Sequence, residues 1–153
     1  MTMSMSNFDP DLFLSTSLDS KLDTVRPAIP PREYTAVIDD VIPRMTRSDD
    51  GTEYLIFDVL WAIDDQALKD ATGRSKITSR QSLFLDMTPS GSIDAGKGKN
   101  TQLGRLREAV GQNTPGPWAP SMLKGAVARV KVINDTNKKT GDIFDKVVSV
   151  AKL

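Results

Sequence analysis

The chain of 153 residues contains neither cysteine nor histidine. Without cysteine it can form no disulfide bond, no zinc–thiolate site and no thiol nucleophile. Without histidine it lacks the most common general base and the most common metal ligand, and it cannot build a Ser–His or Cys–His catalytic pair. These two absences weigh against an enzyme, and we expect no catalytic residue, bound metal or cofactor.

Long apolar runs are also missing. No stretch approaches the ~20 residues that a membrane-spanning helix needs, and the N-terminal "MTMSMSNFDPD" has neither the basic nor the apolar region of a signal peptide. We therefore expect a cytoplasmic protein without a membrane partner. Hydrophobic residues are 39% and charged residues 26% of the chain, so most of it should fold around a single core.

Net charge is zero, but the charges are unevenly distributed. Residues 1–76 hold 8 basic and 14 acidic side chains, a net of −6, and residues 77–153 hold 12 and 6, a net of +6. Such an asymmetry is typical of a chain with an acidic segment and a basic surface, as nucleic-acid-binding proteins have. The alternative is that folding mixes the two signs over one surface.

Polar residues and prolines separate an N-terminal arm from a folded domain. Residues 1–26 are polar, carry an excess of acids and have no sustained period, which predicts a flexible arm. The prolines of "RPAIPPR" then stop any helix and impose an extended entry. We expect the folded domain over residues 27–153.

Five segments of this domain alternate apolar and polar side chains with a period of two, which is typical of half-buried strands. They are residues 33–42, 54–63, 77–87, 126–133 and 143–150. In the second segment, the odd positions from Leu55 to Ile63 are all apolar and predict the core-facing side, with Trp61 in the core. A loop over residues 43–53, turning at its Asp-Gly pair, should connect the first two strands.

One helix is expected, over residues 100–111. Its apolar side chains at i, i+3 and i+7 fall on one stripe, and Asn100 or Thr101 can cap it. The segment between the second and third strands is a polar connection with room for a helical turn. Three strands, one short helix and two strands predict a mainly β protein, a five-stranded antiparallel OB-fold barrel with the helix between strands 3 and 4.

The segment "GSIDAGKGKN" partly matches the phosphate-binding pattern G-x-x-x-x-G-K-[ST]. Gly91, Gly96 and Lys97 fit, but Gly98 stands where a Ser or Thr would hold magnesium. The helix also begins too late for its N-terminus to meet a phosphate in the loop. We interpret the segment as a mobile basic loop in which Lys97 and Lys99 can contact backbone phosphates.

Three segments together resemble a known family. "EYTAVIDDV" opens the fold, "TQLGRLREAVG" leads into "PWAPSMLKGAVARVKV", and "NKKTGDIFDKVVSV" forms the last hairpin. Over residues 32–150 the chain is similar to small phage-encoded single-stranded DNA-binding proteins with an OB-fold. The resemblance implies sequence-tolerant binding of single-stranded DNA during phage DNA replication or recombination, in the cytoplasm of the infected bacterium, and no chemistry.

Sequence-tolerant binding of a single strand requires a basic groove and aromatic faces on which bases stack. In an OB-fold the groove crosses strands 2 and 3, between the loops that join strands 1 to 2 and strands 4 to 5. Candidates are the side chains on the non-core face of strands 2 and 3, the cations of the loops and two cations of strand 4. The predicted DNA-binding residues are Tyr54, Ile56, Arg80, Phe84, Arg44, Arg47, Lys97, Lys99, Arg129, Lys131, Lys138 and Lys139.

Several aromatic and basic residues have a purely structural alternative. Tyr54 could line the rim of the barrel, and Phe84 could seal a small second core beneath the arm. Lys138 and Lys139 could serve only solubility. Trp118, in a proline-rich connector, could be a base platform or an anchor for its own loop, and we favour the anchor.

Two other classes of function stay open. An OB-like domain can act as a protein-interaction or phage assembly module without nucleic acid, which the zero net charge favours slightly. A nuclease or nucleotide hydrolase could bind magnesium through Asp39, Asp40, Asp49 or Asp50. Asp39 and Asp40 are adjacent on a strand and should point to opposite faces, so they should not chelate one ion together.

The acidic and aromatic residues of "NFDPDLFL" indicate a role for the arm. We hypothesise that the arm recruits phage replication or recombination proteins, or that it competes with DNA for the groove. The alternative is that it packs on the barrel or has no role. Exposed strand edges could also pair two copies of the chain, although nothing in the sequence selects a homo-oligomer.

Overall fold

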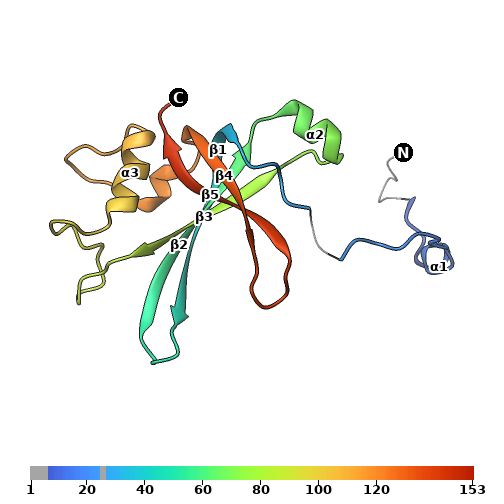
Figure 1. Ribbon diagram of the computed structural model, residues 1–153, viewed down its shortest axis with the longest axis horizontal. Coiled ribbons are helices and arrows are strands. Elements are labelled where there is room, and N and C mark those ends of the chain that lie inside the picture. Colours follow the sequence, from blue (N-terminus) through green and yellow to red (C-terminus); the bar gives the residue numbers. More distant parts are fainter. Residues whose placement is uncertain (1–6, 25–26) are drawn as a thin grey trace.

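The computed structural model describes residues 7–24 and 27–153, and it consists mainly of β-strands. Its five-stranded sheet has the order β3-β2-β1-β4-β5, and every neighbouring pair is antiparallel (Figure 1). The strands are β1 (Glu33–Arg47), β2 (Glu53–Ile63), β3 (Thr78–Leu85), β4 (Val127–Thr136) and β5 (Ile143–Ala151). The mainly β class and the antiparallel arrangement of five strands are therefore confirmed.

Strand β1 is longer than the sequence predicts. It continues to Arg47 through the segment expected as a loop, and this extension pairs with β2. Of β1, only residues 33–37 pair with β4. In the described sheet, the second half of β1 is therefore paired on one side, with β2, and has an open edge on the other. A proline, here Pro43, is tolerated at such an edge although it cannot donate a hydrogen bond. The chain then turns where predicted: the amide of Gly51, at φ 85°, donates to the Ser48 carbonyl over 2.9 Å.

The described residues contain more helices than the single one expected. They are α1 (Pro10–Leu14), α2 (Gln66–Thr72), α3 (Thr101–Ala109) and a 3-10 turn, η2 (Pro120–Leu123). Along the chain, α3 follows β3 only after the loop of residues 86–100, and η2 separates it from β4. The extra helices α1 and α2 depend on caps, because Asp9 accepts hydrogen bonds from the amides of Asp11 and Leu12, and Asp65 accepts one from Leu68. Within the described ranges, no helix combines the length and the apolar character needed to cross a membrane.

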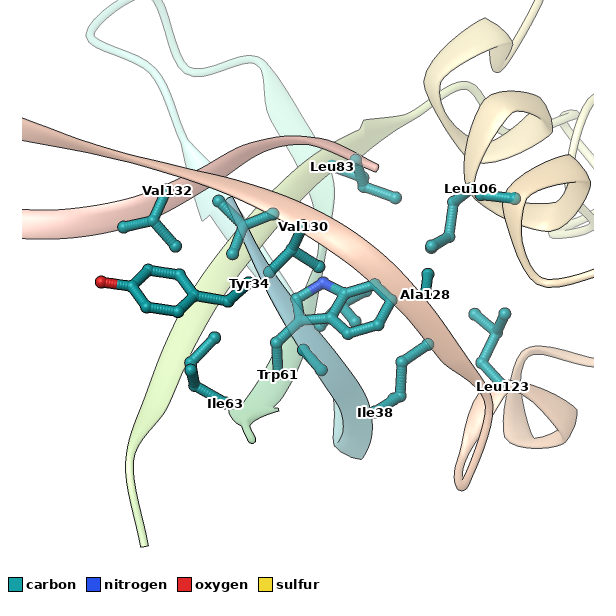
Figure 2. Packing of buried hydrophobic residues seen from close by; sticks show 14 of the residues in the cluster. Tyr34, Ile38, Trp61, Ile63, Leu83, Leu106, Leu123, Ala128, Val130 and Val132 are labelled. Carbon is teal, nitrogen blue, oxygen red and sulfur yellow. The ribbon is translucent and has the colours of Figure 1, made fainter. Parts of the chain in front are cut away.

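The core lies on one face of the curled sheet and is covered by residues of α3 and η2. Trp61 is fully buried in the middle of the core, among side chains from β1 and β4 (Figure 2). Its Nε1 donates a hydrogen bond of 3.0 Å to Oε1 of Gln81 on β3. The odd positions of β2 are buried as predicted, apart from Leu55, which is half-buried near the hairpin end.

The sheet curls but does not close. Its end strands, β3 and β5, approach each other, yet no backbone ladder joins them in the described part of the chain. A side chain links them instead, because Asp145 of β5 accepts a 2.6 Å hydrogen bond from Oγ of Ser79 on β3 and a 3.2 Å one from the amide of Ile29. The five-stranded antiparallel sheet is shown, and a closed barrel is not.

Residues 7–24 bury none of their side chains. Phe8 and Phe13 contact each other, with ring centroids 5.7 Å apart, and the two leucines of α1 are exposed. Figure 1 shows α1 away from the sheet. These residues of the predicted arm therefore do not pack on the domain.

Candidate nucleic-acid interface

The sheet face opposite the core brings together five of the predicted residues. The strand register places Ile56 of β2 directly between Arg44 of β1 and Phe84 of β3. Tyr54 lies two residues from Ile56 along β2, towards the hairpin, and Arg80 lies four residues from Phe84 along β3, opposite Leu60. Side chains that oppose each other on one face of a sheet are close enough to interact. We term this surface, formed by Arg44, Tyr54, Ile56, Arg80 and Phe84, the outer face.

Tyr54 and Phe84 form an exposed aromatic pair on the outer face. Their ring centroids are 6.4 Å apart and their planes lie at 86°, an edge-to-face arrangement. Tyr54 is 42% exposed and Phe84 is 63% exposed. Phe84 therefore does not seal a second core beneath the arm, and both rings present surface on which a base could stack.

A buried carboxylate holds the two arginines of the outer face. Asp58 is 2% exposed and accepts hydrogen bonds of 2.6 Å from Nε of Arg44 and 2.6 Å from Oγ of Ser82. Nη1 of Arg80 lies 3.9 Å from the same carboxylate. Asp58 therefore positions a guanidinium nitrogen of each arginine. The two arginine side chains are still 45% and 57% exposed, so much of each stays accessible.

The ionisation of Asp58 depends on these partners. Burial raises the pKa of its carboxyl group, but the hydrogen bonds from Arg44 and Ser82 and the charges of Arg44 and Arg80 outweigh burial and lower the pKa below its usual value. The sequence pattern places Asp58 on this face but does not identify it as a site residue. The available signal was a single acid within an apolar strand, which needs a partner if it is buried.

Replacing Asp58 with asparagine should lower the free energy of unfolding at neutral pH by about 1–3 kcal/mol, because the charge that binds both arginines is lost. Since the pKa of Asp58 is lower in the folded chain than in the unfolded chain, its contribution is complete above the unfolded value of about 4 and is lost as pH falls through the folded value. Urea unfolding of wild type and Asp58→Asn, from about pH 7 down to about pH 2, measures this difference. A difference that stays constant over this range contradicts the assigned role.

Ile56 lies on the predicted face but is not accessible, since it is only 5% exposed. Its neighbours across the two ladders are Arg44 and Phe84, both of which have longer side chains. The alternating pattern identifies the face of a strand and not the depth of each residue on it. The expectation of a surface contact at Ile56 is therefore wrong, and this residue supports its neighbours.

The predicted loop cations occupy two hairpins. Arg44 and Arg47 belong to β1 rather than to the expected loop, and Nη2 of Arg47 donates to Oε1 of Glu53 over 2.7 Å. Lys138 and Lys139 are exposed in the turn between β4 and β5. Figure 1 shows both hairpins extending from the same side of the sheet, so their cations could approach one elongated ligand from two ends.

The structure does not bring Arg129 and Lys131 to the aromatic pair. Both are exposed on β4, as predicted. They lie opposite Thr35 and Glu33 at the start of β1, whereas the outer face is formed by the other end of β1. A strand rises about 3.3 Å per residue, which separates the two positions widely. These two cations therefore form a strip of their own.

The glycine-rich loop has more internal structure than the sequence predicts. Asn100, with a φ of 53°, does not cap α3 with its side chain. Its Nδ2 donates to the carbonyls of Asp86 and Asp94 over 2.9 Å each, and its Oδ1 accepts from the Asp86 amide over 2.8 Å. These bonds tie the end of the loop back to its beginning, and leave Lys97 and Lys99 exposed. Helix α3 begins after the loop, as predicted.

Trp118 anchors its own loop, as favoured from the sequence. It packs against the core, and its Nε1 donates to Oε1 of Gln112 over 2.8 Å. The guanidinium carbon of Arg107 lies 4.4 Å from the ring centroid and covers one face of the indole. A ring that is covered in this way has little surface left for a base.

Three of the four acids considered as magnesium ligands have other partners. Asp39 and Asp40 each form an ion pair with a lysine, at 2.7 and 3.6 Å. Hydrogen bonds from Ser48 and Thr52 lower the pKa of Asp50 to about 2, as part of the hairpin turn. Within the described ranges, no three acidic side chains lie close enough together to hold a metal ion.

No protein-family model matches the chain, and no curated protein shows significant similarity to it. A functional interpretation therefore has to rest on the geometry of the outer face. That geometry combines two exposed rings in contact, two half-exposed arginines and a buried carboxylate that holds the arginines beside the rings.

Proposed function

We propose that the chain binds single-stranded DNA, with little sequence preference, across the outer face. The observation that carries the proposal is the exposed Tyr54–Phe84 pair beside two arginines held by Asp58. Every base has a π-face that can stack on an aromatic ring, and phosphates meet cations without regard to sequence. A duplex keeps its base faces stacked inside, so this combination favours a single strand.

An OB-like arrangement supports the same proposal. Three strands, α3 and two further strands follow one another as in an OB-fold, within a curled antiparallel sheet. In that fold the face of strands 2 and 3, between the flanking loops, is where oligonucleotides bind. The resemblance of residues 32–150 to phage single-stranded DNA-binding proteins favours a role in phage DNA replication or recombination, in the cytoplasm of the infected bacterium.

A protein-interaction or assembly module is the alternative. The exposed apolar side chains of α1 and the zero net charge of the chain favour it. Salt separates the two functions, because binding to phosphates releases counterions and weakens steeply as salt rises. Contacts between apolar protein surfaces do not weaken in this way.

Fluorescence anisotropy of a labelled oligothymidylate, at low and at moderate salt, tests the proposal. We expect tight and salt-sensitive binding, against which an unlabelled duplex of equal length competes poorly. Absence of binding at low salt contradicts the proposal, and affinity capture of protein partners would then be the appropriate next experiment.

Replacing Lys138 and Lys139 with alanine should weaken binding modestly and flatten its salt dependence. Each phosphate contact on a single strand contributes about 0.7 to the slope of log K against log salt, so losing both should reduce the slope by about 1.4. The matched control is the double variant Lys69→Ala/Arg74→Ala. It removes the same charge in and just after α2, which follows the end of β2 opposite to the β1–β2 hairpin. An unchanged slope for the lysine pair means that these side chains serve only solubility.

A further inference from the structure

A groove of about 720 Å³ lies between β3 and β5, directly beside the outer face. It occupies the gap where the two end strands of the sheet approach without pairing, and residues of α3 line it as well. Arg80 and Phe84 belong both to the outer face and to the wall of the groove. The groove is therefore continuous with the proposed DNA-binding surface.

The groove repeats the chemistry of the outer face with residues that the sequence did not single out. Strand β5 contributes Phe144, which is 41% exposed, and Lys146, and α3 contributes Arg105. Arg105 is exposed, and it forms no ion pair with any other residue that the structure describes. Lys146 is paired with Asp135 over 2.8 Å, whereas Arg105 has no such partner, within the described residues, to displace when it contacts a phosphate.

Asp145 is the single acid among the described residues that line the groove, and we expect it to repel a bound anion only weakly. Asp145 already accepts hydrogen bonds from Ser79 and from the amide of Ile29. The unpaired edges of β3 and β5 could take an extended peptide by strand addition. The cations along the groove and its continuity with the outer face favour a polyanion over a peptide.

We infer that the β3–β5 groove continues the single-strand track, so that a strand lying on the outer face crosses β3 between Arg80 and Phe84 and ends against α3. Phe144 provides a second stacking platform, and Arg105 contacts a phosphate. The inference rests on the proposed function, because the strand reaches the groove from the outer face. It adds a subsite and predicts that the affinity depends on the length of the strand.

Oligothymidylates of about 6 and about 16 nucleotides, within the usual range of site sizes for one OB-fold, test the subsite. We expect the short strand to occupy the outer face and the long strand also to reach the groove. Arg105→Ala and Phe144→Ala should each weaken binding of the long strand about tenfold and leave the affinity for the short strand unchanged. Unchanged affinity for the long strand, or equal weakening at both lengths, overturns the inference.

Two control variants match these changes. Arg74→Ala removes the same side chain beside α2, away from the groove, and Ile143→Ala truncates an exposed neighbour of Phe144 that does not line the groove. Thermal unfolding should show all four variants folded. If wild type binds neither strand, the proposed function fails. If it binds both and the double variant Arg105→Ala/Phe144→Ala matches wild type on the long strand, only the subsite fails.

Discussion

Replacing Trp61 with alanine is expected to lower the free energy of unfolding by about 3–5 kcal/mol. The indole is fully buried in the middle of the core, so its removal leaves a cavity that the surrounding strands can fill only in part. The change also takes the donor from Oε1 of Gln81, which is itself buried, and an unsatisfied buried acceptor adds to the loss. Because small domains are stable by only about 5–15 kcal/mol, this single change should bring the chain close to unfolding.

Urea unfolding followed by circular dichroism measures this effect without relying on tryptophan fluorescence. Trp61→Phe is the informative companion, since it keeps an aromatic ring in the core and loses the hydrogen bond and part of the indole volume, and it should cost less than the alanine variant. Phe84→Ala removes an exposed ring whose aromatic partner is Tyr54, and it should lower the free energy of unfolding by only about 1 kcal/mol. A wild-type midpoint for Trp61→Ala would contradict the assigned place of the indole in the core.

Truncating the aromatic pair should have the largest effect on binding. Tyr54→Ala and Phe84→Ala should each weaken the affinity for single-stranded DNA by about 1–3 kcal/mol, or roughly 5- to 150-fold, because each removes a surface on which a base stacks. Both residues are exposed, so the fold should be unaffected. Since the two rings contact each other, the double variant should lose less than the sum of the single losses. Anisotropy with a labelled oligothymidylate measures all three variants.

Two conservative changes separate stacking from general apolar contact. Tyr54→Phe keeps the ring and should bind like wild type. Phe84→Leu keeps apolar surface but removes the π-face, and it should bind nearly as weakly as Phe84→Ala. Wild-type affinity for Phe84→Leu would mean that the contact is apolar and not aromatic. If both alanine variants bind like wild type while remaining folded, the outer face is not the binding surface.

The strands of the sheet could be predicted because burial on one face leaves a period of two in the sequence. Strand β2 is the clearest case, with Phe57, Val59, Trp61 and Ile63 buried and the intervening positions on the other face. The end of β1 was missed because Pro43 and several polar residues resemble a loop, and only pairing with β2 makes them a strand. Helix α1 was missed, and α2 was expected only as a helical turn within a polar connection, because caps rather than a long apolar stripe set both.

The candidate site could be predicted in part. Tyr54, Arg80 and Phe84 lie on the expected face, since period two is enough to assign a face. The depth of Ile56 and the role of Asp58 depend on which side chains lie opposite on the neighbouring strands, and this register cannot be read from one strand alone. For the same reason the groove beside Phe144 and Arg105 was not expected, because it exists only where β3 and β5 approach in space.

In the described part of the sheet, the seam between β3 and β5 is the place where two strands approach without a backbone ladder. Each of the four ladders reverses the strand direction, so these two end strands run parallel, and Asp145 bridges them near their starts. Their far ends can therefore move apart or together without breaking a backbone hydrogen bond of any ladder. Low-cost openings of this kind define the flexible parts of a protein. For the proposed binding of single-stranded DNA, a seam that opens in this way would accommodate purines and pyrimidines alike, whereas a sheet sealed on all sides would have a fixed width.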